Sequence, residues 1–256
     1  MYANSMYFEE ARTALNNLRK YTKSKIVFYD IGLNEVEISE LHTVCNLELR
    51  HLNYSKYPEF TRSPLGYHFK ALIVAEVFSS LRAFWVMDTS VRFFAPMDDF
   101  YARVNRAELE SVVLRHPTSH SIYAATRPEM YKYLPIDPDI AKQLDMREAN
   151  TIFIKRDDFS REVVKWWFLC SVTQDCFTPK YSQTNCYWAS GKNGEDRFNE
   201  YAGCHRFDQS ALNVIVVNLL HRNGRHLWTR QRKEEFGHFT IVERYSKDGQ
   251  RLNISC

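Results

Sequence analysis

The sequence has no apolar run long enough to cross a bilayer. Its longest mainly apolar stretches, such as 71–77 and 214–217, fall well short of the roughly 18 residues that a transmembrane helix requires. The N-terminus also lacks the hydrophobic core of a secretory signal peptide. As written, the chain is expected to be soluble and to contain no membrane span.

An excess of charge of one sign is also missing. The 34 basic and 31 acidic residues give a formal charge of +3, far from the one-sided excess of chains that coat nucleic acid. Nucleic acid is therefore not an expected partner. The 256 residues, 45% of them hydrophobic, are enough for one large domain with a substantial core. No repeat, low-complexity tract or Pro/Gly/Ser linker divides them, so we expect a single domain over 1–256.

The six cysteines include no C-x-x-C pair, which argues against a zinc site. An even number of cysteines allows disulfides in an oxidising compartment. Two N-glycosylation triplets, beginning at Asn53 and Asn253, favour the same compartment, the secretory lumen. The alternative is six ordinary buried thiols in a cytosolic protein, which the missing signal sequence favours.

Strand-like and helix-like segments alternate along the first half of the chain, which indicates an α/β fold with a mostly parallel sheet flanked by helices. The spacing of apolar residues predicts helices at 5–20, 35–45, 67–81, 139–147, 161–172 and 209–221. It predicts strands at 25–29, 47–52, 83–87, 121–125, 151–155 and 238–245. The helix at 67–81 is apolar all round and should be buried.

The beginning of the chain does not follow the usual order of a doubly wound fold. Such a fold opens with a strand whose carboxyl end helps to bind the nucleotide, whereas this chain starts just before a predicted helix. Either the fold manages without that first strand, or the sequence is a truncated version of a longer one.

Two predicted strands are followed by an acid, Asp30 and Asp88. Ligands of open α/β sheets gather outside the carboxyl ends of the strands, so both acids are candidate donor-binding residues. Asp88 and Ser90 project to the same side of an extended segment and are candidate ligands of Mn or Mg, with phosphate oxygens and water completing the octahedron. The alternative is an aspartate that begins a turn.

Lys70 lies in the first turn of the helix at 67–81, where the helix dipole disfavours a cation unless an anion is present. A diphosphate would supply that anion, and the free amides of the helix terminus would add donors. This helix leads directly into the strand that Asp88 follows, so one helix-strand unit brings both residues to one ligand. The alternative is a lysine that reaches solvent from a buried helix.

A second acid, Asp208, stands at the start of the helix at 209–221. Its position is typical of an N-cap. A functional acid at this place would act as a general base or stabilise positive charge developing at a sugar carbon.

Five blocks of the sequence resemble, in order, those of a nematode-expanded glycosyltransferase-like family defined by a domain of unknown function. The blocks are YDIGL (29–33), YHFKALIVAEV (67–77), WVMDTSVRF (85–93), KWWFLCSVTQDCFTP (165–179) and CHRFDQSALN (204–213). The resemblance covers nearly the whole chain. That family in turn resembles nucleotide-diphospho-sugar transferases with the GT-A fold, including the glycogenin-like enzymes.

The resemblance implies a metal-dependent transferase that moves a sugar from a nucleotide-sugar donor to a glycan or glycoprotein, in the Golgi or another secretory lumen, or outside the cell. Carried over residue by residue, Lys70 meets the donor phosphates, Asp88 the Mn or Mg ion and the nucleotide, and Asp208 with Gln209 the transferred sugar or the acceptor. It also implies that Cys170, Cys176 and Cys204 are disulfide partners.

The sequence departs from the family pattern in three ways. Ser90 stands where active relatives of the wider fold have the second acid of D-x-D, which weakens the metal site. The C-terminal metal-binding histidine motif is not recognisable in 221–228. Members of the family carry a strand before the first helix and an upstream membrane anchor, so we expect a truncated N-terminus. The alternatives are a catalytically inactive, lumenal or secreted binding protein, and an intracellular scaffold with free thiols.

Overall fold

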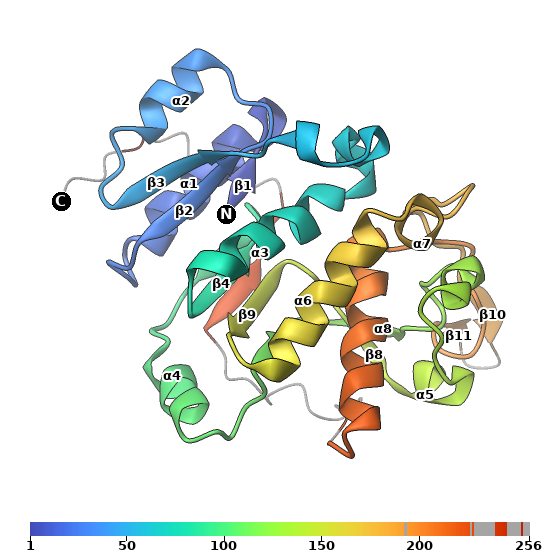
Figure 1. The fold of residues 1–256 in the computed structure, drawn as a ribbon. Helices are drawn as coiled ribbons and strands as arrows, with labels where there is room; N and C mark the ends of the chain where they lie inside the picture. The colour runs from blue at the N-terminus through green and yellow to red at the C-terminus, as the bar shows by residue number, and fades with distance from the viewer. Residues whose placement is uncertain (192–193, 226, 228–238, 245–251, 253–256) are drawn as a thin grey trace.

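The computed structural model describes residues 1–191, 194–225, 227, 239–244 and 252, which form strands with helices on both sides (Figure 1). Buried side chains form two apolar clusters. The larger cluster contains side chains of α3 (His68–Ser80), α6 (Asp158–Ser171) and α8 (Phe207–Arg222), and the smaller one contains those of α1 (Phe8–Leu18). The α/β class with flanking helices is therefore confirmed.

Three strands form a parallel sheet in the order β1 (Tyr2–Ala3), β2 (Ile26–Asp30) and β3 (Leu47–His51). The first two strands are joined through α1 and the next two through α2 (Glu35–Leu41), because parallel neighbours require a crossover connection. A strand does precede the first helix, contrary to the expectation that this fold lacks it. It is short, and its two residues pair with Tyr29 and Asp30.

The other described strands pair in antiparallel orientation. Their apolar patterns did not indicate this orientation. β4 (Ala83–Met87), β9 (Thr151–Lys155) and β6 (Val112–Leu114) form a three-stranded sheet in the order β4-β9-β6. The remaining antiparallel pairs are β5 (Val91–Phe93) with β12 (Thr240–Val242), β7 (Pro117–Ser121) with β8 (Asp145–Arg147), and β10 (Ala189–Gly191) with β11 (Gly194–Asp196).

Successive residues of β9 face different sides of the sheet. Ile152 and Ile154 belong to the larger apolar cluster, whereas Phe153 belongs to the smaller one. In β4, Val86 and Met87 divide in the same way. Because helices cover both faces, these strands read as continuous apolar runs and not as alternating ones.

The helices α3, α6 and α8 lie side by side on one face (Figure 1). Every residue from His68 to Val74 in α3 is buried, as the apolar pattern predicted. Residues 210–217 of α8 are buried as well. The first turns of α3 and α8 therefore carry Lys70 and Asp208 into the interior, where charged groups need partners.

Shorter helices complete the described part of the chain. They are α4 (Asp98–Asn105), α5 (Pro138–Gln143), α7 (Gln174–Phe177) and 3₁₀ helices at Ser5–Tyr7, Tyr54–Lys56, Glu59–Arg62, Pro64–Gly66 and Pro128–Lys132.

Two predicted segments are wrong. The strand expected at 121–125 is the turn that follows β7, which ends at Ser121. The helix expected at 139–147 stops at Gln143, and the chain then forms β8. In β8, the buried Asn213 side chain on α8 bonds both the N–H and the C=O of Arg147, a long-range contact that local propensity does not contain. Of the strand expected at 238–245, 240–242 is confirmed as β12, and residues 238 and 245 lie outside the described residues.

The expected disulfide partners are confirmed. Cys170 bonds to Cys176, which ties α6 to α7, and Cys186 bonds to Cys204. Cys45 is also in a disulfide. Two disulfides of this kind are compatible with a secretory-pathway or secreted protein. Among the described helices, none combines the length and the hydropathy that a membrane span needs.

Candidate functional site

A small cavity of ≈ 110 Å³ opens where the first turns of α3 and α8 meet the loop after β4. Lys70 from α3, Asp88 from the loop, and Asp208 with Gln209 from α8 line it. Asp208 is not the N-cap that its position predicted, because α8 begins at Phe207 and its N-cap is Arg206. The structure thus brings together four of the six residues that the sequence singled out.

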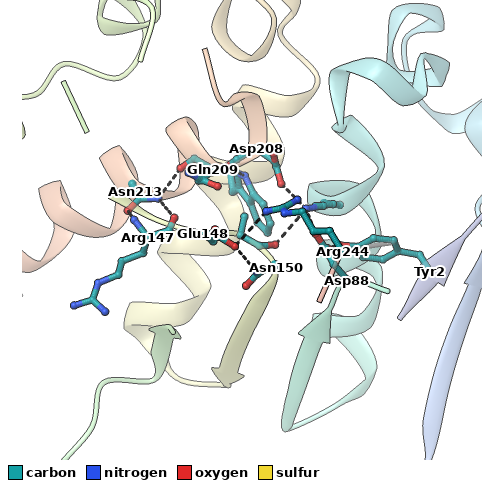
Figure 2. A network of polar contacts seen from close by, with 12 residues as sticks. Tyr2, Asp88, Arg147, Glu148, Asn150, Asp208, Gln209, Asn213 and Arg244 are labelled. Atoms are coloured by element: carbon teal, nitrogen blue, oxygen red, sulfur yellow. Dashed lines mark hydrogen bonds and ion pairs between the residues drawn. The ribbon is translucent and has the colours of Figure 1, made fainter. Parts of the chain in front are cut away.

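Lys70 is the central residue of this cavity and is only 5% exposed. Its ammonium nitrogen lies 3.1 Å from Asp88 Oδ2 and 2.9 Å from Asp208 Oδ2, and it donates to the carbonyl oxygen of Ala149 at 3.3 Å. Asp88 and Asp208 come from different elements and lie on the two sides of the cavity where Figure 2 labels them. Lys70 therefore does not reach solvent from its buried helix, and that alternative is wrong.

The charges of this cluster are interdependent. Burial alone would lower the pKa of Lys70, but the carboxylates of Asp208 and Asp88 outweigh burial and hold that pKa well above its usual value. Burial raises the pKa of Asp208, and Lys70 opposes that shift. Lys70 therefore stays protonated, while Asp208 takes up a proton more readily than an exposed aspartate does.

Two tyrosines complete the surroundings of Lys70. The Tyr2 and Tyr67 rings have their centres 5.9 and 5.6 Å from the ammonium nitrogen. The Tyr2 hydroxyl donates to Asp88 Oδ1 through a short hydrogen bond (Figure 2). Burial and the neighbouring Asp88 raise the pKa of Tyr2 well above its usual value, so the phenol keeps its proton. Both oxygens of Asp88 are thus already in contact with side-chain donors.

The backbone is strained on two sides of the cavity. Tyr67 at the N-cap of α3 has φ 56°, and Phe207 at the start of α8 has φ 42°, both in the left-handed region. Each such conformation costs a non-glycine residue about 1–3 kcal/mol. The two rings lie 5.9 Å apart. Strain of this kind concentrates at sites where a ligand or a reaction requires a fixed geometry.

Two arginines that the sequence reasoning did not assign also line the cavity, Arg206 and Arg244. Figure 2 shows Arg244 beside Glu148, and the nearest nitrogen and oxygen are 3.6 Å apart. Arg206 is half-buried and donates to Cys186 Sγ at 3.6 Å. Burial, and then the nearby charge of Arg244, lower the pKa of Arg206. One signal for Arg206 was available, because it lies in the block that contains Asp208.

Two candidate residues are not brought to this cavity. The Asp30 carboxylate accepts from the backbone N–H groups of Gly32 and Leu33 at 2.8 and 2.7 Å and pairs with His51 at 2.8 Å. It therefore fixes the turn after β2. Ser90 is buried away from the cavity, and its carbonyl oxygen accepts from the N–H of Glu243 at 2.8 Å.

The residues present do not fit the expected Mn or Mg ion. These ions take an octahedron of oxygen donors. Within the described residues, no group of three or more His, Cys, Asp or Glu side chains is placed to hold a metal unaided, so an ion completed by phosphate oxygens and water would need the free oxygens of one or two carboxylates. Asp88 contacts Tyr2 and Lys70 with its two oxygens, and Ser90 does not line the cavity with it.

Asn213 and Trp167 hold the start of α8 in place. The Asn213 amide accepts from the N–H of Arg147 at 2.8 Å and donates to its carbonyl at 2.7 Å (Figure 2). Trp167 on α6 donates its indole N–H to the carbonyl oxygen of Asp208 at 3.1 Å. These contacts fix the main chain at Asp208 and Gln209 relative to β8 and α6.

Comparison with known proteins supports the fold. Residues 2–75 match the model of a family described as a protein of unknown function (DUF1647). No curated protein matches the sequence significantly. Among solved structures, the chain is similar to the galactosyltransferase LgtC in complex with donor and acceptor sugar analogues, with a TM-score of 0.51 and 10% identity, over 98% of this chain and 88% of that one.

A second similar structure is an active-site mutant of LgtC in which a glutamine is replaced by glutamate. Its TM-score is 0.51 and its identity 11%, over the same shares of the two chains, 98% and 88%. Identities this low speak for the fold alone. The chain therefore has a glycosyltransferase-like α/β fold of GT-A type, with a parallel sheet flanked by helices.

Proposed function

We propose that this chain is a glycosyltransferase, a single GT-A-like domain over 1–256 that takes a nucleotide-sugar donor and adds its sugar to a glycan or glycoprotein. The observation that carries the proposal is the position of Lys70 between Asp88 and Asp208, in a cavity at the end of β4. Ligands of open α/β folds bind at such strand ends. The match over 2–75 agrees with the resemblance of the sequence blocks to a family defined by a domain of unknown function, and we propose that this family is the nematode-expanded one.

Each residue has a role that follows from its charge and place. In the transfer, the bond between the anomeric carbon and the diphosphate breaks, and its electron pair stays on the diphosphate. Lys70 offsets that added charge, which is the main electrostatic demand of the step. The acceptor hydroxyl bonds to the carbon and loses its proton. Asp208 stabilises positive charge at the sugar or takes that proton, since its raised pKa suits a base.

Gln209 lies beside Asp208 and is assigned to the transferred sugar or the acceptor. An active-site glutamine is named for LgtC, and by analogy we give Gln209 that place. The expected dependence on Mn or Mg is not part of this mechanism, because Asp88 and Ser90 do not form a set of metal donors. Asp30 is assigned to the turn that it fixes and not to the donor.

A second candidate function is a catalytically inactive relative that binds a ligand in the lumen or outside the cell. The observation that favours it is the size of the cavity, ≈ 110 Å³, well below the roughly 300 Å³ at which small-molecule sites begin. Lys70 is also fully paired without any ligand. A transferase would have to widen this cavity when the donor enters.

Donor binding in Asp88→Asn separates the site from the rest of the molecule. Calorimetric titration with UDP-, GDP- and ADP-sugars should show binding to the natural chain and a few-fold tighter binding to this variant, because the change removes a negative charge beside Lys70. Asp158→Asn is the matched control, because Asp158 is 95% exposed at the start of α6, outside the cavity. Unchanged donor affinity in Asp88→Asn would count decisively against the site.

We also propose a place in the Golgi or another part of the secretory pathway, or outside the cell, with a glycan at Asn53. Asn53 is exposed, and its Oδ1 accepts from the N–H and the hydroxyl of Ser55 at 3.0 and 2.7 Å. The second triplet, at Asn253, lies outside the described residues. Expression through a secretory pathway should give a chain whose mass falls on treatment with an N-glycosidase, and Asn53→Gln should remove that difference.

A further inference from the structure

We propose that three basic side chains, Lys70, Arg206 and Arg244, bind the diphosphate of the donor in the place where a divalent cation would otherwise lie. This inference rests on the proposed function, because it concerns the same cavity. It makes donor binding independent of Mn and Mg.

The Lys70 ammonium occupies the place that a divalent cation would take. It lies 3.1 Å from one carboxylate and 2.9 Å from the other, so it occupies the space between Asp88 and Asp208. Magnesium binds carboxylate oxygens at about 2.0–2.1 Å, so an ion between these acids would overlap the ammonium group. The lysine supplies the positive charge that the metal would bring.

The two arginines that line the cavity favour an anionic ligand. Arg206 forms no ion pair with any described carboxylate, and its buried Nε has no hydrogen-bond partner there. The charge of Arg244 is close enough to lower the pKa of Arg206. Two guanidinium groups that share one cavity repel each other, and Glu148, 3.6 Å from Arg244, offsets this repulsion only in part. Planar guanidinium groups bind phosphate oxygens in pairs, so a diphosphate fits this arrangement.

The charges that line the cavity also favour an anion over a divalent cation. Three acids, Asp88, Glu148 and Asp208, line the cavity together with the three cations. Arg244 is free to turn toward a ligand, because its side chain is 62% exposed and its contact with Glu148 is long, 3.6 Å. A diphosphate that binds Arg244 and Arg206 places its negative charge beside the two cations that have the weakest contacts with acids in this cavity. A divalent cation would have to displace Lys70 first.

Calorimetric titration of the full chain with UDP, GDP and ADP tests the inference. Each nucleotide is titrated once in EDTA and once in MnCl₂. We expect at least one to bind with a Kd that is the same within about threefold in both conditions, and to weaken steeply as salt is raised. Binding at least tenfold tighter in MnCl₂ would overturn the inference and leave the proposed function standing. No binding in either condition would overturn both.

Two variants test whether Arg244 contributes to nucleotide binding. Arg244→Ala should weaken nucleotide binding in EDTA by about tenfold, the loss of one charge-assisted contact. Arg225→Ala is the control, since Arg225 is also exposed but pairs with Glu110 outside the cavity, and the nucleotide affinity of this variant should equal that of the natural chain. Equal affinity of Arg244→Ala and the natural chain would contradict the role of the arginine.

Lys70→Ala gives a readout that does not depend on nucleotide. Removing the ammonium leaves Asp88 and Asp208 facing each other, so this variant should bind Mn²⁺ alone, measured by electron paramagnetic resonance, whereas the natural chain should not. Tight Mn²⁺ binding by the natural chain would overturn the inference. If Lys70→Ala does not fold, the titrations of the natural chain and of Arg244→Ala decide the question.

Discussion

The ammonium nitrogen of Lys70 lies 2.9 Å from the carboxylate of Asp208, and both side chains are buried. One comes from the first turn of α3 and the other from the first turn of α8, so the contact ties two helix starts together inside the cavity. A buried lysine needs such partners, because an isolated charge in the interior is unfavourable by several kcal/mol. The same contact determines how much of the Lys70 charge is available to a ligand in the cavity.

Asp208→Asn should separate binding from turnover. The change removes a negative charge next to Lys70, so UDP should bind a few-fold more tightly than to the natural chain. Sugar transfer should fall by about 100-fold or more, because the base or charge-stabilising group is lost. Calorimetry gives the first quantity, and initial rates of sugar transfer give the second. Weaker UDP binding in Asp208→Asn would contradict the assigned arrangement.

Elements with a strong apolar pattern of their own could be predicted from the sequence. The helix at 67–81 and the strand at 83–87 stand out by length and apolar pattern. Because these two elements follow each other, the approach of Lys70 to Asp88 could be predicted as well. β8 was not predictable, because its three residues are held by Asn213 from a distant helix. Ser90 was misplaced for a related reason, since the D-x-S spacing assumes an extended segment where the structure has a turn.

Asn213→Leu should destabilise the fold strongly. Asn213 is fully buried, and its amide bonds the N–H and C=O of Arg147 as well as the carbonyl oxygen of Gln209. Leucine fills the space but leaves the N–H and C=O of Arg147 without these partners, which costs about 3 kcal/mol. Urea unfolding measures the loss. Asn218→Ala is the control on the same helix: it removes one partly exposed hydrogen bond, to Pro135, and should cost under about 1 kcal/mol.

Stability should fall as the pH is lowered from about 6.5. Burial lowers the pKa of His205 and of His120 to about 4, so both are neutral when folded. The His205 ring cannot accept a proton without losing the hydrogen bond that Nδ1 accepts from the N–H of Arg127. Between pH 6.5 and 4 the unfolded chain binds more protons, so each histidine removes up to about 1.4 kcal/mol per pH unit.

Urea unfolding at pH 7, 6 and 5 measures this slope. His205→Gln should be less stable at pH 7 but should lose less stability on acidification than the natural chain does. The comparison isolates His205 because Asp208, whose pKa is raised, contributes with the opposite sign in both proteins. A natural chain whose unfolding free energy is constant from pH 7 to 5 would contradict the neutral, buried state of these histidines.

Loss of the disulfide between Cys186 and Cys204 should weaken both the fold and the site. The two cysteines are 18 residues apart, so replacing both by alanine should cost about 3 kcal/mol, mainly because the unfolded chain gains freedom. The bridge also holds Thr184 and Arg206, which line the cavity, and Arg206 contacts Cys186 directly. Nucleotide affinity should therefore fall several-fold, measured at a temperature where the variant is folded.

The disulfide between Cys170 and Cys176 provides the matched comparison. It closes a shorter loop, with a separation of 6, so removing it by the same double alanine change should cost only about 2 kcal/mol. Neither cysteine lines the cavity, and the bridge ties α6 to α7. Thermal unfolding should rank the two variants in this order, and UDP titration should show a loss of affinity only for the pair at 186 and 204. An equal loss of affinity in both variants would mean that general destabilisation, and not the placement of Arg206, governs binding.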